Sequence, residues 1–403
     1  MRIRFSEDFK GQPAVIKIIG VGGAGGNAVN RMVEVGLKHV EFIAANTDAQ
    51  DLRRSRAHVK VQMGSQLTQG LGVGGDPAKG REAAEESIDT IKNLVTGANM
   101  VFIANGMGGG TGTGAAPLVA KLAKEEGALT IGIVSRPFEF EGRVRAQQAE
   151  AGIREMRNYV DTLLIIPNDK IFNIIDETTT TTEAYLMADD VLRKATQAIT
   201  DVITTSGEIN VDFADVRTIM KSAGEAIIGI GESEGSHRAV DAAKKAIVSP
   251  LLENVSIDGA KGALVNITAS HTLLFTEIKE VMTYVHSVVS PEAHVFFGQA
   301  NDENLKSKIR VTVIATGFPA KTSRTRAPHL REFNLNRELP VIAGETLRSI
   351  SGRAETQSKA KDKDDTGDIL PTGKRFKVNK SQTPPDDVLK KPSYLRTTTR
   401  RLR

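Results

Sequence analysis

Cysteine and tryptophan are absent from the 403 residues, and tyrosine occurs only four times. Without cysteine the chain has no disulfide framework, no thiolate metal site and no cysteine nucleophile, which fits a reducing compartment. No stretch approaches the roughly 20 consecutive apolar residues of a membrane-spanning helix, and the charged amino terminus lacks the apolar core of a signal peptide. We therefore expect a cytoplasmic protein that is neither exported nor inserted in a membrane.

Residues 1–320 carry no excess of positive charge. Residues 321–403 carry 20 Lys and Arg against 10 Asp and Glu, so this tail has a net charge of +10 and the rest of the chain −6. The basic character belongs to an appendage. We therefore expect no nucleic-acid-binding surface on the folded body.

Short β-branched segments alternate with longer stretches of helical period between Ala14 and Phe318, a pattern typical of parallel sheets flanked by helices. A long helical pattern from Glu183 to Ser206 divides the chain. We expect an α/β fold with a Rossmann-like parallel-sheet domain, a long central helix and a second, smaller α/β domain. The predicted strands are 14–20, 41–47, 100–105, 129–135, 162–168, 263–269, 293–299 and 309–316.

The periodicity stops after Gly317, and the stretch to Pro385 is rich in Thr, Ser, Lys, Asp and Arg. This composition predicts a disordered linker, because it buries too little apolar surface to offset the ordering entropy. Residues 386–403 regain apolar side chains among basic ones, which predicts a short docking peptide, with a frayed solvated end as the alternative. The predicted segments are an N-terminal extension 1–13, a nucleotide-binding domain 14–182, a central helix 183–206, a second domain 207–320, a linker 321–385 and a docking peptide 386–403.

Two glycine-rich runs follow predicted strands. The first, GVGGAGG (20–26), has glycines at 20, 22 and 25 that satisfy the dinucleotide fingerprint, which alone is a weak signal. The second, NGMGGGTGTGAAP (105–117), interleaves glycine with Thr111 and Thr113 and predicts a backbone that wraps an anion, with Pro117 near the first turn of the next helix. Two such loops indicate one nucleotide whose phosphate chain is held from both sides.

The P-loop motif of ordinary nucleotide triphosphatases is absent from the sequence. The phosphate charge must therefore be met by helix dipoles, backbone N–H groups, a metal ion and an arginine.

The chain resembles the tubulin/FtsZ superfamily of GTPases, and in particular its bacterial cell-division members. The similarity extends from about Ala14 to Phe318 and recurs at the carboxyl end. Several independent motifs occur in the family's order: GVGGAGGNAVNRM (20–32), NTDAQ (46–50), GLGVGGDPAKGREAAEES (70–87), GGGTGTGAAP (108–117), PFEFEGRVR (137–145), IPND (166–169), ADDVL (188–192), NVDFADV (210–216) and RVTVIATGF (310–318).

The resemblance implies a GTP site with Mg²⁺ as the accompanying ion. Glu141 and Arg145 are four residues apart, so we expect one helix face to carry them toward the ribose and phosphates. Asp189 matches the family's guanine contact, Asn168 a second one, and Tyr185 replaces the usual Phe that stacks on the base. The implied GTP-binding residues are Gly22, Gly23, Ala24, Gly25, Gly26, Asn27, Gly108, Gly109, Gly110, Thr111, Gly112, Thr113, Glu141, Arg145, Asn168, Tyr185 and Asp189.

The segment GEINVDFADV (207–216) resembles the family's synergy loop, which reaches into the nucleotide site of the next subunit. The resemblance implies that Asp212 and Asp215 polarise the attacking water and that Asn210 orients nearby groups. A helix N-cap followed by a first-turn acid is the structural alternative for this Asp pair. Glu208 stands where relatives usually carry Leu, and the Thr178–Thr182 run departs from the family's usual apolar entry to this helix.

The resemblance thus implies an assembly-activated GTPase that polymerises head to tail and forms the division ring at mid-cell. The peptide around Pro392, Tyr394 and Leu395 would bind membrane-tethering and regulatory division proteins. Two alternatives remain: a tubulin-like plasmid-partition filament protein, and an oxidoreductase that binds a dinucleotide on the first loop. The second glycine-rich loop disfavours the oxidoreductase.

Overall fold

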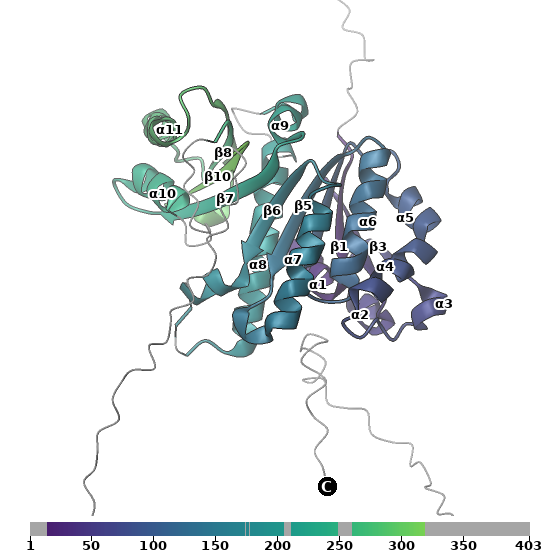
Figure 1. Cartoon of the computed structure of the whole chain (residues 1–403). Helices are drawn as coiled ribbons and strands as arrows, with labels where there is room; N and C mark the ends of the chain where they lie inside the picture. The colour runs from purple at the N-terminus through teal and green to yellow at the C-terminus, as the bar shows by residue number, and fades with distance from the viewer. Residues whose placement is uncertain (1–13, 174, 177, 205–210, 249–259, 319–403) are drawn as a thin grey trace, which may run out of the picture. The chain divides into compact units, whose positions relative to one another are not determined.

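The computed structural model describes residues 14–318, except 174, 177, 205–210 and 249–259 (Figure 1). The predicted N-terminal extension, linker and docking peptide lie outside the described residues. The elements are β1 (Ile16–Val21), α1 (Gly22–Val35), β2 (Glu41–Asn46), α2 (Ala49–Arg54), β3 (Val59–Gln62), α3 (Ser65–Thr68), α4 (Pro77–Glu86), α5 (Ile88–Val95), β4 (Met100–Gly106), α6 (Thr111–Glu125), β5 (Leu129–Arg136), α7 (Arg143–Met156), β6 (Thr162–Pro167), α8 (Thr181–Thr204), α9 (Phe213–Met220), β7 (Gly224–Ser233), α10 (Arg238–Ile247), β8 (Gly262–Ala269), α11 (Phe275–Val288), β9 (His294–Asn301) and β10 (Ile309–Thr316).

The strands form one mixed sheet in the order β3-β2-β1-β4-β5-β6-β7-β10-β8-β9. Strands β1 to β6 are parallel, and β7 continues parallel to β6 through Thr162 paired with Gly224. Strand β10 then runs antiparallel to both β7 and β8, and β9 is parallel to β8. The expected α/β fold with a parallel sheet and a long central helix is confirmed, and the strands of the expected second domain continue the same sheet.

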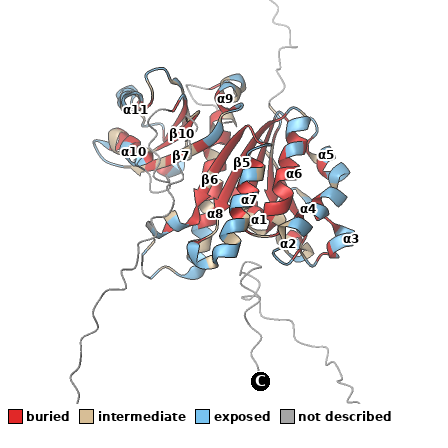
Figure 2. Ribbon diagram, viewed as in Figure 1, coloured by how far each residue is buried: buried red, intermediate tan, exposed pale blue. Residues whose placement is uncertain are grey.

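Helices cover both faces of the central parallel strands, and nearly all residues of β1, β4 and β5 are buried (Figure 2). On one face, α1 and α8 pack on alternate residues such as Ile18 and Phe102. On the other face, α5, α6 and α7 pack on the intervening residues such as Ile19 and Ile103. The alternation follows from the two-residue period of a strand, and it leaves the ends of the strands open for a ligand.

The threonine run before α8 forms its amino-terminal cap. The Thr180 N–H donates to Glu183 Oε2 at 2.8 Å, and the Glu183 N–H donates to Thr180 Oγ1 at 3.3 Å. Such a reciprocal pair satisfies two N–H groups of the first turn. Asp176 Oδ1 accepts hydrogen bonds from the Thr178 N–H and from the hydroxyl groups of Thr178 and Thr179. These contacts account for Thr178, Thr179 and Thr180, and α8 starts at Thr181, before the expected Glu183.

The second sheet region carries α10 and α11 on one face and meets α8 and α9 on the other. Glycines in β7 allow α10 to approach closely. A Cβ atom on Gly229 would lie 1.9 Å from the Ala246 carbonyl oxygen, and one on Gly231 would lie 2.1 Å from that of Ala242. Strand β7 was not predicted, because its glycines interrupt the β-branched pattern that signals a strand.

Strand β3 was also missed, since it has only four residues, two of them polar, and lies at the edge of the sheet beside β2. Helix α6 differs from expectation as well. It begins at Thr111, so the glycine run itself supplies the first turns and Pro117 lies inside the helix.

In the described residues, no helix combines the length and hydropathy needed to cross a bilayer.

Candidate functional site

An open cavity of about 760 Å³ lies at the carboxyl ends of β1, β2, β4, β5 and β6. Ligands of open parallel sheets bind at this edge, because the loops that follow the strands meet there. The residues that resembled a GTP site come together at this cavity. All of them line it except Gly25, Gly26 and Thr113.

The amino ends of α1 and α6 both open onto the cavity. Neither first turn contains an acidic residue, and no side chain caps either end. The first backbone N–H groups of a helix have no partner within the helix, and the helix dipole adds partial positive charge there. Two such ends facing one cavity suit a chain of phosphate groups.

The glycines keep the cavity floor free of side chains. Gly22 has a φ of +72°, and a Cβ atom there would lie 2.9 Å from the backbone nitrogen of Gly112. A Cβ atom on Gly110 would lie 2.4 Å from the Val73 side chain. The two glycine-rich loops therefore meet backbone to backbone, which exposes their N–H groups to a ligand.

The three predicted residues outside the cavity lining help to shape or simply flank the loops. A Cβ atom on Gly25 would lie 2.2 Å from the Ala104 carbonyl oxygen, so this glycine lets α1 approach β4. Thr113 is buried, and its Oγ1 accepts a hydrogen bond of 2.8 Å from the Gly108 N–H. Gly26 has open space around it. The sequence pattern does not separate glycines that face a ligand from glycines that face a strand.

Tyr185, Asp189 and Asn168 gather at one part of the lining. Tyr185 and Asp189 lie one turn apart on α8, and Asn168 directly follows β6. Asn168 is 7% exposed, and its Oδ1 has no hydrogen-bond partner among the described residues. A buried acceptor without a donor is costly, and a ligand with N–H groups would satisfy it.

Among the described acidic residues that line the cavity, Asp189 has the pKa furthest from its usual value. Burial raises the pKa of its carboxyl group to about 8, although the Arg31 charge and a hydrogen bond from the Asn27 side chain oppose the rise. The next residue, Asp190, does not line the cavity and instead pairs with Arg193 and Lys194. Of these two neighbouring carboxyl groups, only that of Asp189 is thus presented to the cavity.

Tyr185 is held against an aromatic cluster. Its ring meets Phe138 edge-on, with centroids 5.3 Å apart and planes at 89°. Phe138 is 2% exposed and also contacts Phe140 and Phe172. This packing fixes the position of Tyr185 at the cavity wall.

Glu141 and Arg145 contact each other, but not as predicted. Glu141 ends a 3₁₀ turn, Arg145 belongs to α7, and Gly142 separates the two elements with a φ of +100°. Arg145 Nη1 nevertheless lies 3.1 Å from Glu141 Oε2, and Glu141 Oε1 accepts from the Phe138 N–H at 2.9 Å. The expected shared helix is wrong because the glycine breaks it, yet both side chains line the cavity.

Several lining residues received no role from the sequence. Asn46 is the last residue of β2, and Thr47, Asp48 and Asp51 follow it. The loop Gly70–Gly75, which has four positive-φ glycines, contributes the residues from Leu71 to Gly75 to the lining. The NTDAQ motif (46–50) contains most of these polar residues. Its place at the carboxyl end of a parallel strand could have predicted that they line a ligand site.

The described residues contain no group of three or more His, Cys, Asp or Glu side chains placed to hold a metal ion. Asp48 and Asp51 line the cavity as separate carboxylates. This sparse set fits Mg²⁺, which keeps several waters and binds through one or two carboxylates together with substrate phosphates. It does not suit an all-protein metal cage.

Asp212 and Asp215 do not line the cavity. Asp212 occupies the N-cap position of α9, but its carboxylate makes no capping hydrogen bond and is exposed. Helix α9 lies near the start of β6, because the Met220 carbonyl at its end accepts a hydrogen bond from Thr162, the first residue of that strand. The cavity lies beyond Pro167, the last residue of the same strand. A six-residue strand separates these levels by about 20 Å (Figure 1). Asn210 and Glu208 lie outside the described residues.

Two family models match the chain. Residues 15–176 match the GTPase domain of the Tubulin/FtsZ family, and residues 224–319 match the C-terminal domain of the FtsZ family. The matched ranges cover the cavity-forming strands and the second sheet region, respectively.

Solved structures agree with these matches. An empty FtsZ dimer from M. jannaschii is 44% identical, with a TM-score of 0.73 over 76% of this chain and 89% of that chain. GDP-bound monomeric CetZ1 from Haloferax volcanii is 22% identical, with a TM-score of 0.66 over 76% and 95% of the two chains. CetZ2 in a GTPγS-bound protofilament is 23% identical, with a TM-score of 0.63 over 76% and 94%. The two CetZ matches show a shared fold.

Proposed function

This chain belongs to the tubulin/FtsZ family of GTPases, and from that membership we propose that it assembles head to tail into filaments that build the cell-division ring. Each subunit binds GTP in the cavity at the carboxyl ends of its parallel strands. The synergy loop of the next subunit, which carries Asp212 and Asp215, completes the hydrolytic site.

Guanine selection is assigned to Asp189 and Asn168. An ionised Asp189 accepts hydrogen bonds from guanine N1–H and the exocyclic amine, while adenine would leave the buried oxygens without donors. Tyr185 stacks on the base, and Glu141 and Arg145 meet the ribose and phosphates. Two observations support this assignment. The carboxyl group of Asp189 is buried, and Asn168 Oδ1 has no hydrogen-bond partner among the described residues.

The phosphate chain is assigned to the two helix ends. Backbone N–H groups of Gly22, Gly23 and Ala24 meet it from α1, with the Asn27 side chain beside them. Gly110, Thr111 and Gly112 meet it from α6, next to Gly108 and Gly109. Asp48 and Asp51, which line the cavity, would hold a bound Mg²⁺ through its waters, and the ion would supply positive charge to the phosphates.

One observation carries the proposal that hydrolysis requires assembly. The carboxylates Asp48 and Asp51 of the described cavity lining are assigned to the metal ion, while the exposed Asp212 and the nearby Asp215 lie outside that lining. A water-orienting carboxylate must come within hydrogen-bond reach of the attacking water. A second subunit stacked on the cavity would supply it, and such head-to-tail contacts repeat into filaments because they need not close.

The oxidoreductase alternative has no support in this arrangement, since both glycine-rich loops line the same cavity rather than separate sites. Plasmid partition remains the second candidate, with similar chemistry. Division at mid-cell is favoured by the NVDFADV segment and by the PSYLR-like terminus, through which tethering proteins would bring the filament to the membrane.

Sedimentation tests the proposal directly. We expect the full chain to pellet with GTP and Mg²⁺ but not with GDP or ATP, and to release phosphate only above a threshold protein concentration. Phosphate release proportional to protein concentration from nanomolar upward would contradict assembly-dependent hydrolysis. Equal pelleting with ATP would contradict the guanine assignment.

A further inference from the structure

Two threonine hydroxyl groups meet at the phosphate end of the cavity. Thr47 Oγ1 lies 2.6 Å from Thr111 Oγ1. Thr47 follows β2 and is fully buried, and Thr111 is the first residue of α6. Of these two threonines, only Thr111 was expected from the sequence to contact phosphate. We propose that Thr47 is a positioning residue whose hydroxyl group directs the Thr111 proton toward the nucleotide phosphates. The inference deepens the proposed function, because it takes GTP as the ligand of this cavity.

The backbone of Thr47 is fixed on both sides. Its N–H donates to Asn46 Oδ1 at 2.8 Å. Its carbonyl oxygen accepts from the Gly72 N–H at 3.2 Å and from Thr68 Oγ1 at 3.3 Å. These contacts commit the polar groups of the main chain and leave the hydroxyl group of Thr47 directed at Thr111. No other side-chain hydrogen bond of this hydroxyl group occurs among the described residues.

The direction of the hydrogen bond follows from the ligand. Either threonine can be the donor in the ligand-free cavity. A hydroxyl group has one proton to donate, and phosphate oxygens only accept. When Thr111 donates its proton to phosphate, its oxygen is left as an acceptor, so Thr47 must donate to it. Aligned hydroxyl groups polarise one another, which strengthens the contact between Thr111 and phosphate.

Thr47 lines the cavity, and in this proposal its hydroxyl group acts through Thr111. It also joins three segments of the cavity lining: the end of β2, the loop that contains Gly72, and the start of α6. Removing the hydroxyl group but not the side-chain volume should weaken the phosphate contact while the base contacts of Asp189 persist.

The test is a double-mutant cycle on GTP and GDP affinity in the full chain. Thr47→Val should weaken binding about 3- to 10-fold, the effect of losing one net hydrogen bond. Thr47→Ser keeps the hydroxyl group and should bind within about 2-fold of the parent. The double variant Thr47→Val with Thr111→Val should bind no more weakly than Thr111→Val alone, because the two side chains act in series.

Thr130→Val is the matched control. Thr130 is fully buried in β5, and its hydroxyl group donates to the Ala128 carbonyl at 3.1 Å, away from the cavity lining. It should change the melting temperature but not nucleotide affinity. The preference for GTP over ITP should stay unchanged in Thr47→Val, since inosine differs only in the amine that Asp189 reads.

Additive losses in the double variant, a Thr47→Ser variant as weak as Thr47→Val, or parent-like binding by Thr47→Val would overturn the inference. A Thr111→Val variant with parent affinity would also overturn it, while GTP binding by the parent chain would leave the proposed function standing. A parent chain that binds no guanine nucleotide would instead refute the proposed function itself.

Discussion

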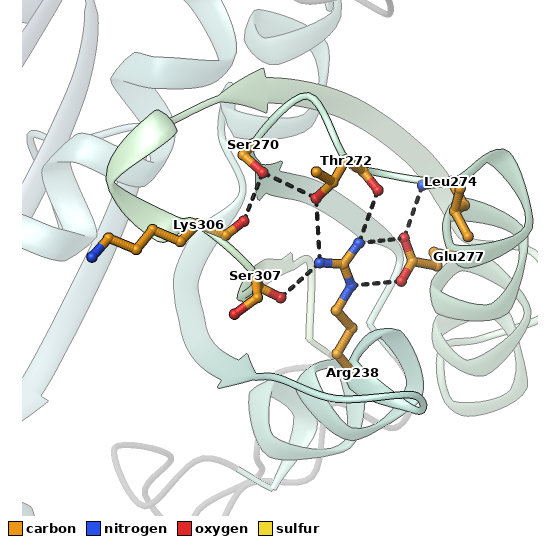
Figure 3. A network of polar contacts seen from close by, with 7 residues as sticks. All are labelled: Arg238, Ser270, Thr272, Leu274, Glu277, Lys306 and Ser307. Atoms are coloured by element: carbon orange, nitrogen blue, oxygen red, sulfur yellow. Dashed lines mark hydrogen bonds and ion pairs between the residues drawn. The ribbon is translucent and has the colours of Figure 1, made fainter.

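Arg238 and Glu277 form a two-point ion pair, with Arg238 Nε 2.6 Å from Glu277 Oε1 and Nη2 3.0 Å from Oε2 (Figure 3). The guanidinium group also donates to the carbonyl oxygens of Ser307 at 2.6 Å and Thr272 at 3.0 Å. Glu277 in turn accepts from the Leu274 N–H at 2.8 Å, which caps α11. One buried arginine thus ties α10 to the loop before α11 and to the turn before β10.

We expect Arg238→Met to lower the free energy of unfolding by about 1–3 kcal/mol, because Glu277, which is partly buried, would lose its ion-pair partner. Arg238→Lys should recover little, since an ammonium group cannot reproduce the planar fork. Chemical denaturation followed by circular dichroism measures the change.

The double variant of Arg238→Met with Glu277→Met is the control, and it should be more stable than Arg238→Met alone. GTP affinity should not change in any of these variants, because no described residue of the cavity lining follows Asp189. A double variant as unstable as the single one would show that the lost packing, not the stranded charge, sets the cost.

GTP affinity should rise with pH between about 6 and 8. Burial raises the pKa of Asp189 to about 8, so the free protein holds a proton there at lower pH. Guanine binding needs the ionised carboxylate, and the proton must leave before both hydrogen bonds form. Linkage then gives about a tenfold gain per pH unit well below pH 8 and a plateau above it. Calorimetry across this range, in buffers of different ionisation enthalpy, measures both the affinity and the released proton.

Asp189→Asn is the control for the pH effect. The amide does not titrate, so its affinity should be independent of pH over this range. Binding should also be weaker by about 1–3 kcal/mol, because one guanine donor loses its acceptor. A parent affinity that is constant from pH 6 to 8 would argue against a proton on Asp189 in the free protein.

Binding and hydrolysis should be separable by mutation. Asp212→Ala or Asp215→Ala should keep GTP binding while turnover falls by at least about 100-fold, the effect of losing a positioned catalytic group. Phosphate release at saturating GTP, together with equilibrium binding, measures the two properties.

Mixing provides a sharper version of this experiment. Asp212→Ala subunits have an intact cavity, and Asp189→Ala subunits have an intact synergy loop. If the site forms between subunits, a mixture of the two should release phosphate faster than either alone. A mixture that shows only the averaged activity of its parts would place the whole site within one subunit.

The carboxyl-terminal peptide lies outside the described residues, and its role stays a prediction. Deleting 386–403 should leave GTPase activity and filament formation intact but abolish recruitment to the membrane. Changing Tyr394 and Leu395 to Ser should have the same effect if a protein groove is the target. Fluorescence imaging of tagged variants in cells measures recruitment.

Changing Arg400, Arg401 and Arg403 to Ser tests the competing account. Each basic residue near an anionic membrane contributes about 1 kcal/mol, and salt screens that attraction. We expect these changes to matter less than the loss of Tyr394 and Leu395. Recruitment that survives the apolar changes and disappears with the arginines would identify lipid as the target.

Local patterns in the sequence predicted much of the fold and of the candidate site. The parallel strands were visible because strands buried on both faces are continuous apolar runs, such as 100–105 and 129–135. The glycine-rich loops were visible because close approach of backbone to phosphate needs glycine at fixed spacing. The family resemblance then identified Asp189, Asn168 and Tyr185. The bacterial origin that it suggested stays a prediction, since the similar structures come from M. jannaschii and Haloferax volcanii.

The sequence by itself determined most of the strands, though not β3 or β7, as well as where the two phosphate loops lie and to which family the chain belongs, because these depend on short-range periodicity and motif order. Only the tertiary structure decided that Gly25 faces a strand while Gly22 faces the cavity, that Thr47 reaches Thr111 across 64 residues, and that burial raises the pKa of Asp189. Each of these depends on which surfaces meet when separate segments pack. Distances between residues far apart in the chain leave no mark in a local pattern.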